Sequence, residues 1–150
     1  MHLAQINVAR LRAPLTDPLL ADFVAALDPI NALAEASPGF VWRLKDDSGA
    51  SSSYVTFGDD DRLIVNMSVW TSIDTLFEYA YRSGHADVFR RRREWFEPID
   101  PPFALWWIPA GHVPSVDEGR AKLATLARLG PTPDAFTFKI RFPQPALREA

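Results

Sequence analysis

The sequence contains no cysteine, and this absence excludes several classes of protein at once. Disulfide scaffolds, thiolate nucleophiles and cysteine-ligated metal sites all require that side chain. Histidine is scarce as well, because His2, His85 and His112 are the only three and lie far apart along the chain. No closely spaced pair of histidines or carboxylates predicts a metal site. We therefore expect a protein of the reducing cytoplasm that holds no metal.

Long apolar runs are also missing. No stretch approaches the roughly 18 consecutive apolar residues that indicate a membrane-spanning helix. The beginning, MHLAQINVARLR, lacks the basic start and apolar core of a secretory signal. Basic charge does not dominate, because 16 Lys and Arg stand against 19 Asp and Glu, for a net charge of −3. A polyanion has little reason to approach such a chain, so we expect neither a nucleic-acid nor a membrane partner.

What the sequence does contain is a succession of strand and helix patterns that fits one domain over residues 1–150. Period-two alternation and short apolar runs predict strands at about 2–9, 40–44, 63–70, 103–109 and 135–142. Helical spacing between capping signals predicts helices at about 18–36, 71–82, 86–96 and 115–129. Asp17 is the expected N-cap of the first helix, Pro29 should kink or restart it, and Gly130 should end the last.

This order predicts an α+β fold, a ferredoxin-like sandwich in which helices cover one face of an antiparallel sheet. The segments LIVNMSVW and FALWWIP are apolar on both faces, so one layer of helices would leave a wide apolar surface in water. A second copy of the sheet is the economical cover. We therefore expect a homodimer in which two sheets form a dimeric α+β barrel.

The segment YRSGHADVFRRRREWF, residues 81–96, carries a histidine, four consecutive arginines and a Trp-Phe pair. Consecutive residues of a helix fan around its circumference, so the four arginines cannot all bind one ligand. Acidic residues at a spacing of four, Asp87, Glu94 and Glu97, predict ion pairs on a solvated helix face. Arg92 is the exception, because it shares a face with His85 and with apolar residues.

Five blocks carry a resemblance that spans nearly the whole chain: PGFVWRL, NMSVWTSIDTLFEYAYRSGH, RREWF, LWWIPAGHVPSVDEG and LGPTPDAFTF. In these blocks the chain resembles an uncharacterised bacterial family, the domain of unknown function number 3291. More loosely, it is similar to the dimeric α+β barrel superfamily, which includes antibiotic-biosynthesis monooxygenases and haem-degrading monooxygenases. The resemblance implies the barrel fold and leaves the reaction open, because one fold hosts many reactions.

The haem-degrading relatives imply three residues, of which this sequence matches one. Asn7 matches their asparagine in the first strand. Tyr79 stands where they have a helical tryptophan, and Phe89 or Arg90 stands where they have a histidine. The resemblance therefore does not support haem degradation. His85 remains an alternative axial haem ligand from another register.

The leading hypothesis is a small-molecule enzyme with an apolar pocket between sheet and helices, of the kind that works as a cofactor-independent monooxygenase on a hydrophobic or aromatic substrate. His85 would be the base, and Arg92 or Asn7 would stabilise the anion. The residues expected to bind the substrate are Asn7, Asn66, Trp70, Tyr81, Trp95 and Trp106. Trp106 and Trp107 must face opposite sides of their strand, and the sequence leaves open which of them faces the pocket.

Two alternatives stay open. One is a module that binds a ligand, or haem through His85, without turnover. The other is a structural dimer in which the aromatic residues only form core and interface. A visible spectrum with and without added haemin separates the haem alternative from the others, because a Soret band should disappear in His85→Ala.

The arginine run generates the first prediction. Arg90→Ala and Arg93→Ala should each change the free energy of unfolding by at most about 0.5 kcal/mol, because exposed charges with screened partners contribute little. Chemical denaturation measures this change. A loss of several kcal/mol would show that the solvent-facing side of the segment has been misassigned.

Overall fold

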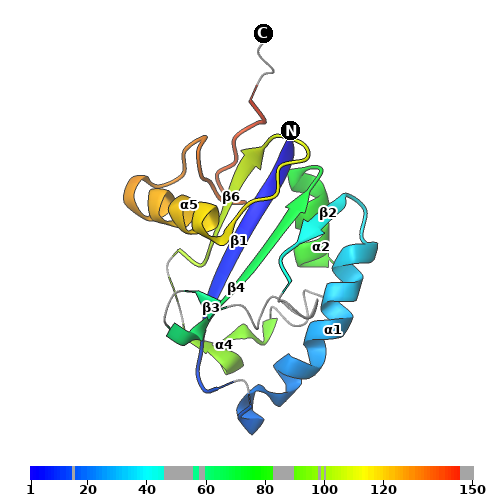
Figure 1. Cartoon of the computed structure of the whole chain (residues 1–150), viewed down its shortest axis with the longest axis vertical. Coiled ribbons are helices and arrows are strands. Elements are labelled where there is room, and N and C mark those ends of the chain that lie inside the picture. The colour runs from blue at the N-terminus through cyan, green and yellow to red at the C-terminus, as the bar shows by residue number, and fades with distance from the viewer. Residues whose placement is uncertain are drawn as a thin grey trace.

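A computed structural model describes residues 1–14, 16–45, 56–57, 60–82, 90–97, 99 and 101–145 of the chain (Figure 1). His85 and its neighbours at 83–89 lie outside the described residues, as do the polar segment at 46–55 and the last five residues. None of the described helices is long and apolar enough to cross a membrane.

Four strands form the main sheet in the order β2-β4-β1-β6, and every neighbouring pair is antiparallel. This is the strand order of a ferredoxin-like fold, so the predicted fold class is confirmed. Two short strands complete the sheet, one against β4 and one beside the end of β1. The strands are β1 (His2–Leu11), β2 (Phe40–Arg43), β3 (Thr56–Phe57), β4 (Asp60–Trp70), β5 (Phe96–Glu97) and β6 (Phe103–Ile108).

The helices begin and end close to their sequence signals. They are the short 3₁₀ helix η1 (Pro18–Leu20), α1 (Ala21–Ala36), α2 (Ile73–Arg82), α4 (Arg92–Trp95) and α5 (Val116–Leu129). The Asp17 carboxylate accepts a hydrogen bond from the Leu19 N–H at 2.9 Å, which confirms the expected N-cap. Gly130 ends α5 with φ 72°, also as expected. α1 is continuous through Pro29, so the restart expected there does not occur.

The pairing of β1 with β4 gives the sheet two different faces. On the first face, Leu3 lies opposite Trp70, Gln5 opposite Ser68 and Asn7 opposite Asn66. On the second face, the partners are apolar throughout: Ala4, Ile6 and Val8 against Val69, Met67 and Val65. Since side chains alternate along a strand, every polar residue in the middle of β1 points to the first face.

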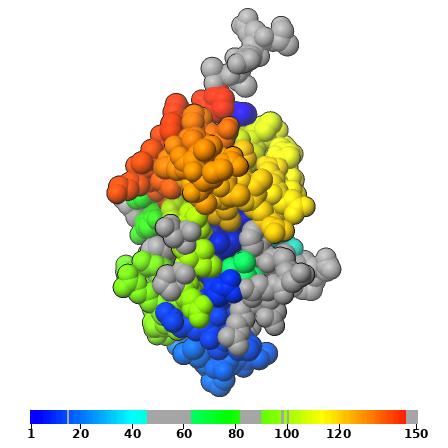
Figure 2. Space-filling view, turned by 90° about the vertical axis from the view of Figure 1, so that its left-hand side faces the viewer, coloured from blue at the N-terminus to red at the C-terminus, as the bar shows by residue number. Residues whose placement is uncertain are grey.

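Helices cover both faces. On the first, Ala34 of α1 and Leu76 of α2 are buried in one cluster with Trp70. On the second, Leu123 and Leu126 of α5 are buried with the apolar residues of β1, β4 and β6. Figure 2 shows α5, in orange, lying over the upper part of the molecule beside the C-terminal segment. The expectation that helices cover only one face is therefore wrong in this detail.

This arrangement removes the physical motive for the expected homodimer. The prediction of a second copy depends on the expectation that the second face of the sheet would otherwise be exposed to water. Within one chain, however, Ala4, Ile6, Met67, Ala104 and Trp106 are already at most 1% exposed. A sheet-to-sheet barrel through this part of the face would require α5 to move. The single chain does not test assembly, so the homodimer stays a prediction.

The strand predicted at 135–142 does not form. Phe136 makes an isolated antiparallel bridge to Leu105 of β6, and the segment that follows has no ladder. Ring contacts hold it instead, because Phe138 packs edge-on against Phe77 and Tyr81. Ile140 is 49% exposed, so the expected apolar face is not continuous. β6 pairs with β1 on one side only, and on its other side the segment takes a single ladder position, at Leu105, so alternation alone did not specify a strand pairing.

The arginine run also differs from its prediction, although Arg90 and Arg93 are exposed as expected. α4 covers only Arg92–Trp95, with Arg91 as its N-cap, and the chain is already extended at 96–97. The ion pair expected with Asp87 lies outside the described residues. Arg91 binds Glu94 and, in α1, Asp22 at 2.9 Å, and Glu97 lies 4.0 Å from Arg10 Nε.

The packing of α5 generates a prediction for Gly119. A Cβ at this position would lie 2.6 Å from Ile6 Cδ1 and 3.2 Å from Met67 Cε, so the helix sits too close to the sheet for a large side chain. Gly119→Leu should lower the free energy of unfolding by about 1–3 kcal/mol through overpacking. Ala121→Leu, on the exposed side of the same helix, should stay within about 0.5 kcal/mol. Equal urea midpoints for the two variants would contradict this packing.

Candidate functional site

A cavity of about 410 Å³ lies on the first face of the sheet, enclosed by residues of α1, α2 and α4. This volume is within the range of small-molecule sites. Most of its wall is apolar or aromatic: Phe23, Leu27, Ile30, Ile64, Trp70, Leu76, Tyr79, Phe96, Phe103, Leu105 and Phe138. The floor is different, because the polar side chains of β1 and β4 open into it.

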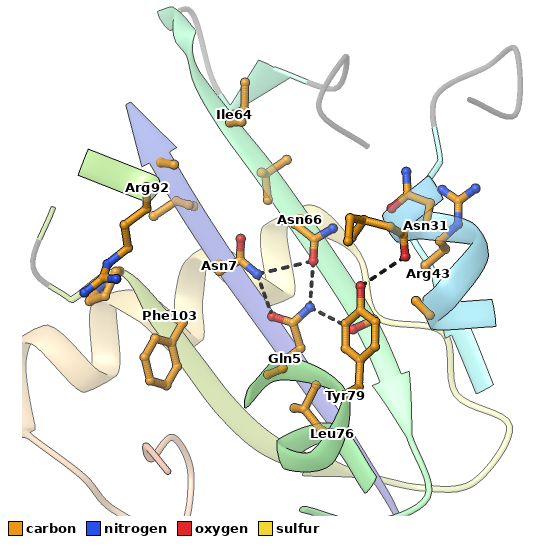
Figure 3. A pocket seen from close by; sticks show the side chains of 18 of the residues that line it. Gln5, Asn7, Asn31, Arg43, Ile64, Asn66, Leu76, Tyr79, Arg92 and Phe103 are labelled. Carbon is orange, nitrogen blue, oxygen red and sulfur yellow. Dashed lines mark hydrogen bonds between the residues drawn. The ribbon is translucent and has the colours of Figure 1, made fainter. Parts of the chain in front are cut away.

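These floor side chains form one hydrogen-bonded network (Figure 3). Gln5 is the centre, since its Nε2 donates to Asn66 Oδ1 and to Ser68 Oγ, both at 2.8 Å. Asn7 Nδ2 donates to Gln5 Oε1 at 3.1 Å and to Asn66 Oδ1 at 3.3 Å. Trp70 Nε1 donates to Ser68 Oγ at 2.8 Å. Gln5 and Ser68 are buried and are satisfied by these bonds, whereas Asn7 lies at the exposed side of the network.

The network leaves one acceptor turned into the cavity. Both hydrogen-bonding directions of Asn7 Nδ2 are used within the network, while Asn7 Oδ1 has no partner among the residues that the structure describes. In Figure 3 this oxygen points away from Gln5 and Asn66. A ligand hydroxyl or amine is the natural complement of such an oxygen.

Two tyrosines of α2 contribute to the wall. Tyr79 stacks on Trp70 with ring centroids 5.1 Å apart and donates its hydroxyl to the Ile30 carbonyl at 3.2 Å. Burial raises the pKa of Tyr79 far above its usual range, against the opposing effect of Arg43. Burial also raises the pKa of Tyr81, against the opposing charge of Arg92. Both phenols therefore stay protonated at neutral pH and act as donors rather than bases.

The charged groups of the wall are two arginines. Arg92 of α4 lies on the β1 side of the network, and Arg43 of β2 lies on the α1 side (Figure 3). Arg43 Nε forms an ion pair with Glu35 Oε1 at 2.7 Å, and this hydrogen bond lowers the pKa of Glu35 against a small effect of burial. Glu35 is not part of the wall. Among the described wall residues there is no aspartate, glutamate or histidine, so the cavity favours a neutral or anionic ligand.

Five of the predicted site residues meet in this cavity: Asn7, Asn66, Trp70, Tyr81 and Arg92. Four of them come from three separate elements, β1, β4 and α2, and Arg92 comes from α4. His85, the predicted base, lies outside the described residues. Its role stays a prediction.

Two predicted residues lie elsewhere. Trp95 is 2% exposed and packs against Phe23 and Phe96 in the core beneath α1. Trp106 faces α5, where its Nε1 donates to Glu118 Oε2 at 2.9 Å. Because Trp106 lies opposite Ala4 and Trp107 opposite Leu3, the cavity-side tryptophan of this pair is Trp107. Neither Trp95 nor Trp106 therefore lines this cavity, contrary to the expectation that they share one pocket with the other predicted residues.

Sequence reasoning missed other wall residues: Gln5, Asn31, Arg43, Ser68 and Tyr79. Gln5 and Ser68 had a usable signal, since each lies two residues from a predicted site residue on the same strand face. No comparable pattern in the sequence indicated Asn31 or Arg43 as wall residues. They reach the cavity only through the packing of α1 against β2.

Whether the protein can ligate haem through His85 depends on residues 83–89, which lie outside the described residues. The described wall offers no histidine, cysteine or methionine, so His85 would have to supply the imidazole. Among the residues that the structure describes, no three His, Cys, Asp or Glu side chains gather closely enough to hold a metal ion.

The chain belongs to the family called domain of unknown function (DUF3291), whose model matches residues 2–150. No curated protein matches the chain. Its relatives among solved structures share the fold at low identity. SnoaB from Streptomyces nogalater, described as a cofactor-independent oxygenase, is 19% identical with a TM-score of 0.51, over 76% of this chain and 98% of its own.

Two further solved structures match this chain with the same TM-score as SnoaB. One is a putative antibiotic biosynthesis monooxygenase from Chloroflexus aurantiacus, 17% identical with a TM-score of 0.51, over 75% of this chain and 98% of its own. The other is NE2512 from Nitrosomonas europaea, of unknown function, 17% identical with the same TM-score, over 76% of this chain and 95% of its own. At this identity the likenesses show a shared fold and leave the reaction of this chain open.

The floor network generates a stability prediction. Gln5→Met keeps the length of the side chain but removes three hydrogen bonds at a buried position, so it should lower the free energy of unfolding by about 1–3 kcal/mol. Asn7→Met should cost less than about 1 kcal/mol, because Asn7 is exposed and water can replace its bonds. Urea denaturation measures both, and the reverse order would contradict the central place of Gln5.

Proposed function

We propose that this member of the DUF3291 family is a small-molecule enzyme, a cofactor-independent monooxygenase that acts on a hydrophobic or aromatic substrate. The observation that carries the proposal is the aromatic-walled cavity with a fixed amide network on its floor and arginine at its edge. The shared fold with SnoaB, described as a cofactor-independent oxygenase, supports it.

The cavity suits a flat, electron-rich ring system. Its apolar walls exclude water from a bound ring, and burial of each aromatic carbon contributes to binding. Asn7 Oδ1 would accept a hydrogen bond from a substrate hydroxyl. Arg92, an exposed residue at the edge of the wall, would stabilise the negative charge that develops when the substrate loses a proton.

The substrate itself would supply the electrons. Loss of a proton from an activated CH₂ group leaves a delocalised carbanion, which transfers an electron to O₂ and combines with it to form a peroxide at that carbon. Cleavage of the O–O bond and loss of the second C–H proton then give a ketone and water. The sum is R₂CH₂ + O₂ → R₂C=O + H₂O, so no external reductant is required.

The base is the incomplete part of this mechanism. The described wall has no histidine or carboxylate, and the raised pKa values of Tyr79 and Tyr81 make those phenols unsuitable as bases. We assign the base to His85, outside the described residues. The absence of a base in the described wall equally favours the alternative of a binding module without turnover, and oxygen uptake distinguishes the two.

Anthrone tests the proposal, since its CH₂ group lies between two rings and is acidified by the ketone opposite. The wild-type protein should consume O₂ and form anthraquinone in a ratio of one to one. Arg92→Gln should lower kcat by about 100-fold, as for loss of one stabilising group in a transition state. An oxygen electrode and chromatography of the product measure both.

The matched control is Arg90→Gln, which removes a neighbouring exposed arginine outside the cavity wall and should leave the rate unchanged. If anthrone is oxidised no faster with protein than in buffer, and no related anthrone or naphthol is oxidised either, the enzyme proposal fails. Binding without oxygen uptake would then favour the ligand-binding module.

A further inference from the structure

α4 carries Arg92 into the cavity wall, yet this helix is too short to fix its own position. It consists of the four residues Arg92–Trp95, and among the described residues no side chain caps its N-terminus. A helix of this length is unstable by itself in water, so contacts with other elements must fix α4. Such contacts are present with α1, with the core and with the end of β1.

The contact with α1 is made by Arg91, the residue directly before α4. Its Nη2 forms an ion pair with Asp22, in the first turn of α1, at 2.9 Å. The same guanidinium donates to the Glu94 carboxylate through Nε at 2.8 Å and through Nη2 at 3.1 Å. Its Cζ lies 4.8 Å from the centroid of the Trp95 ring. A single exposed ion pair contributes little, but a forked pair within a network of charges and a ring is stronger.

The other contacts fix the second half of α4. Trp95 is buried and packs against Phe23 of α1, with ring centroids 5.5 Å apart. Arg12 follows directly after β1, and its backbone N–H donates to the Trp95 carbonyl at 2.8 Å. Arg12 Nε donates to the Arg93 carbonyl at 2.9 Å. Core packing and backbone hydrogen bonds therefore hold this half of the helix, and they do not reach its first residue.

Arg91 and Arg92 point to different sides of the chain. Successive residues of a helix are about 100° apart, and Arg92 contributes to the cavity wall whereas Arg91 does not. Arg91 binds Asp22 instead, and the next residue, Phe23, lines the cavity. Figure 1 shows α4 beside the N-terminal part of α1. The Asp22–Arg91 pair therefore joins the two parts of the wall that α1 and α4 contribute.

We propose that Arg91 and Asp22 are positioning residues, which hold α4 against α1 and so place the Arg92 guanidinium at the edge of the cavity. The inference rests on the proposed function, in which Arg92 stabilises the anion of the substrate. Neither Arg91 nor Asp22 belongs to the cavity wall. Loss of Asp22 should therefore weaken the stabilisation of a bound anion without removing any group that lines the cavity.

A phenol that changes colour on ionisation tests this inference without turnover. 4-Nitro-1-naphthol has two rings and an anion that absorbs visible light, and its nitro group makes the rings too electron-poor for oxidation. The pKa of this probe bound to the whole chain reports how strongly the site favours the anion over the phenol. In wild-type protein this preference should be about tenfold greater than in Arg92→Gln, as for one charge-assisted hydrogen bond.

Variants of Asp22 separate positioning from a purely structural role. Asp22→Asn should lower the preference by a factor of about three, because Arg91 keeps Glu94 but loses its ion pair with α1. Asp22→Glu should retain most of it. In the Arg92→Gln background, Asp22→Asn should have no further effect, since a positioning residue acts only through the residue that it places. The matched control is Asp117→Asn, which alters an exposed ion pair of α5 on the other face and should leave the preference unchanged.

Steady-state kinetics with anthrone give a second readout. Asp22→Asn should lower kcat by a factor of about three and change KM by less than about twofold, because the anion forms only after the substrate has bound. Circular dichroism melting shows whether each variant folds. If Asp22→Asn does not fold, Arg91→Lys becomes the deciding variant, since lysine keeps the charge but lacks the forked geometry.

The outcomes distinguish this inference from the proposed function. Equal preferences in Asp22→Asn and Asp117→Asn would overturn the positioning role, and so would an equal effect of Asp22→Asn with and without Arg92. A preference that falls in Asp22→Asn, in a protein that oxidises neither anthrone nor related compounds, would support the positioning role and overturn the oxygenase. If wild-type protein does not favour the anion of the probe, or does not bind the probe, the role assigned to Arg92 fails, and both proposals depend on that role.

Discussion

The structure depends on how polar side chains are accommodated in the middle of its central strand. β4 pairs with β1 on one side and β6 pairs with it on the other, so the backbone of β1 has no free edge in this part of the sheet. Gln5 is 6% exposed there and would destabilise the fold if its amide were unpaired. Asn66 and Ser68 on β4 provide the partners. Asn7 donates to Gln5 and to Asn66 in the same network. The hydrogen bonds that satisfy the buried Gln5 amide therefore belong to the network that orients a residue of the candidate site.

The two faces of the sheet separate packing from chemistry. The second face is apolar along β1, β4 and β6, and α5 approaches so closely that a Cβ at position 119 would displace the end of the Ile6 side chain. The first face is covered less closely, because α1 and α2 pack near its edges and leave the cavity over the polar floor. A closely packed face gives rigidity and an incompletely filled face gives a binding site, on opposite sides of the same strands.

Charge in the cavity is set by long-range packing. Arg43 and Arg92 are nearly fifty residues apart in sequence and belong to a strand and a short helix, yet both belong to one wall. Glu35 holds Arg43 from outside the cavity wall, and Arg91, the neighbour of Arg92, forms ion pairs with Asp22 and Glu94. Among the described wall residues there are two arginines and no carboxylate, so the described part of the wall carries positive charge.

Local patterns in the sequence determined the four strands of the main sheet, the helix caps at Asp17 and Gly130, the fold class, and five of the wall residues. These features depend on residues close in sequence, through alternation, capping and helical spacing. Tertiary structure alone decided that α5 covers the second face, that Trp107 rather than Trp106 faces the cavity side, and that Phe136 forms a bridge without a strand. It also brought Asn31 and Arg43 together. Each of these depends on which elements pack against each other, and the period of a single segment does not contain that information.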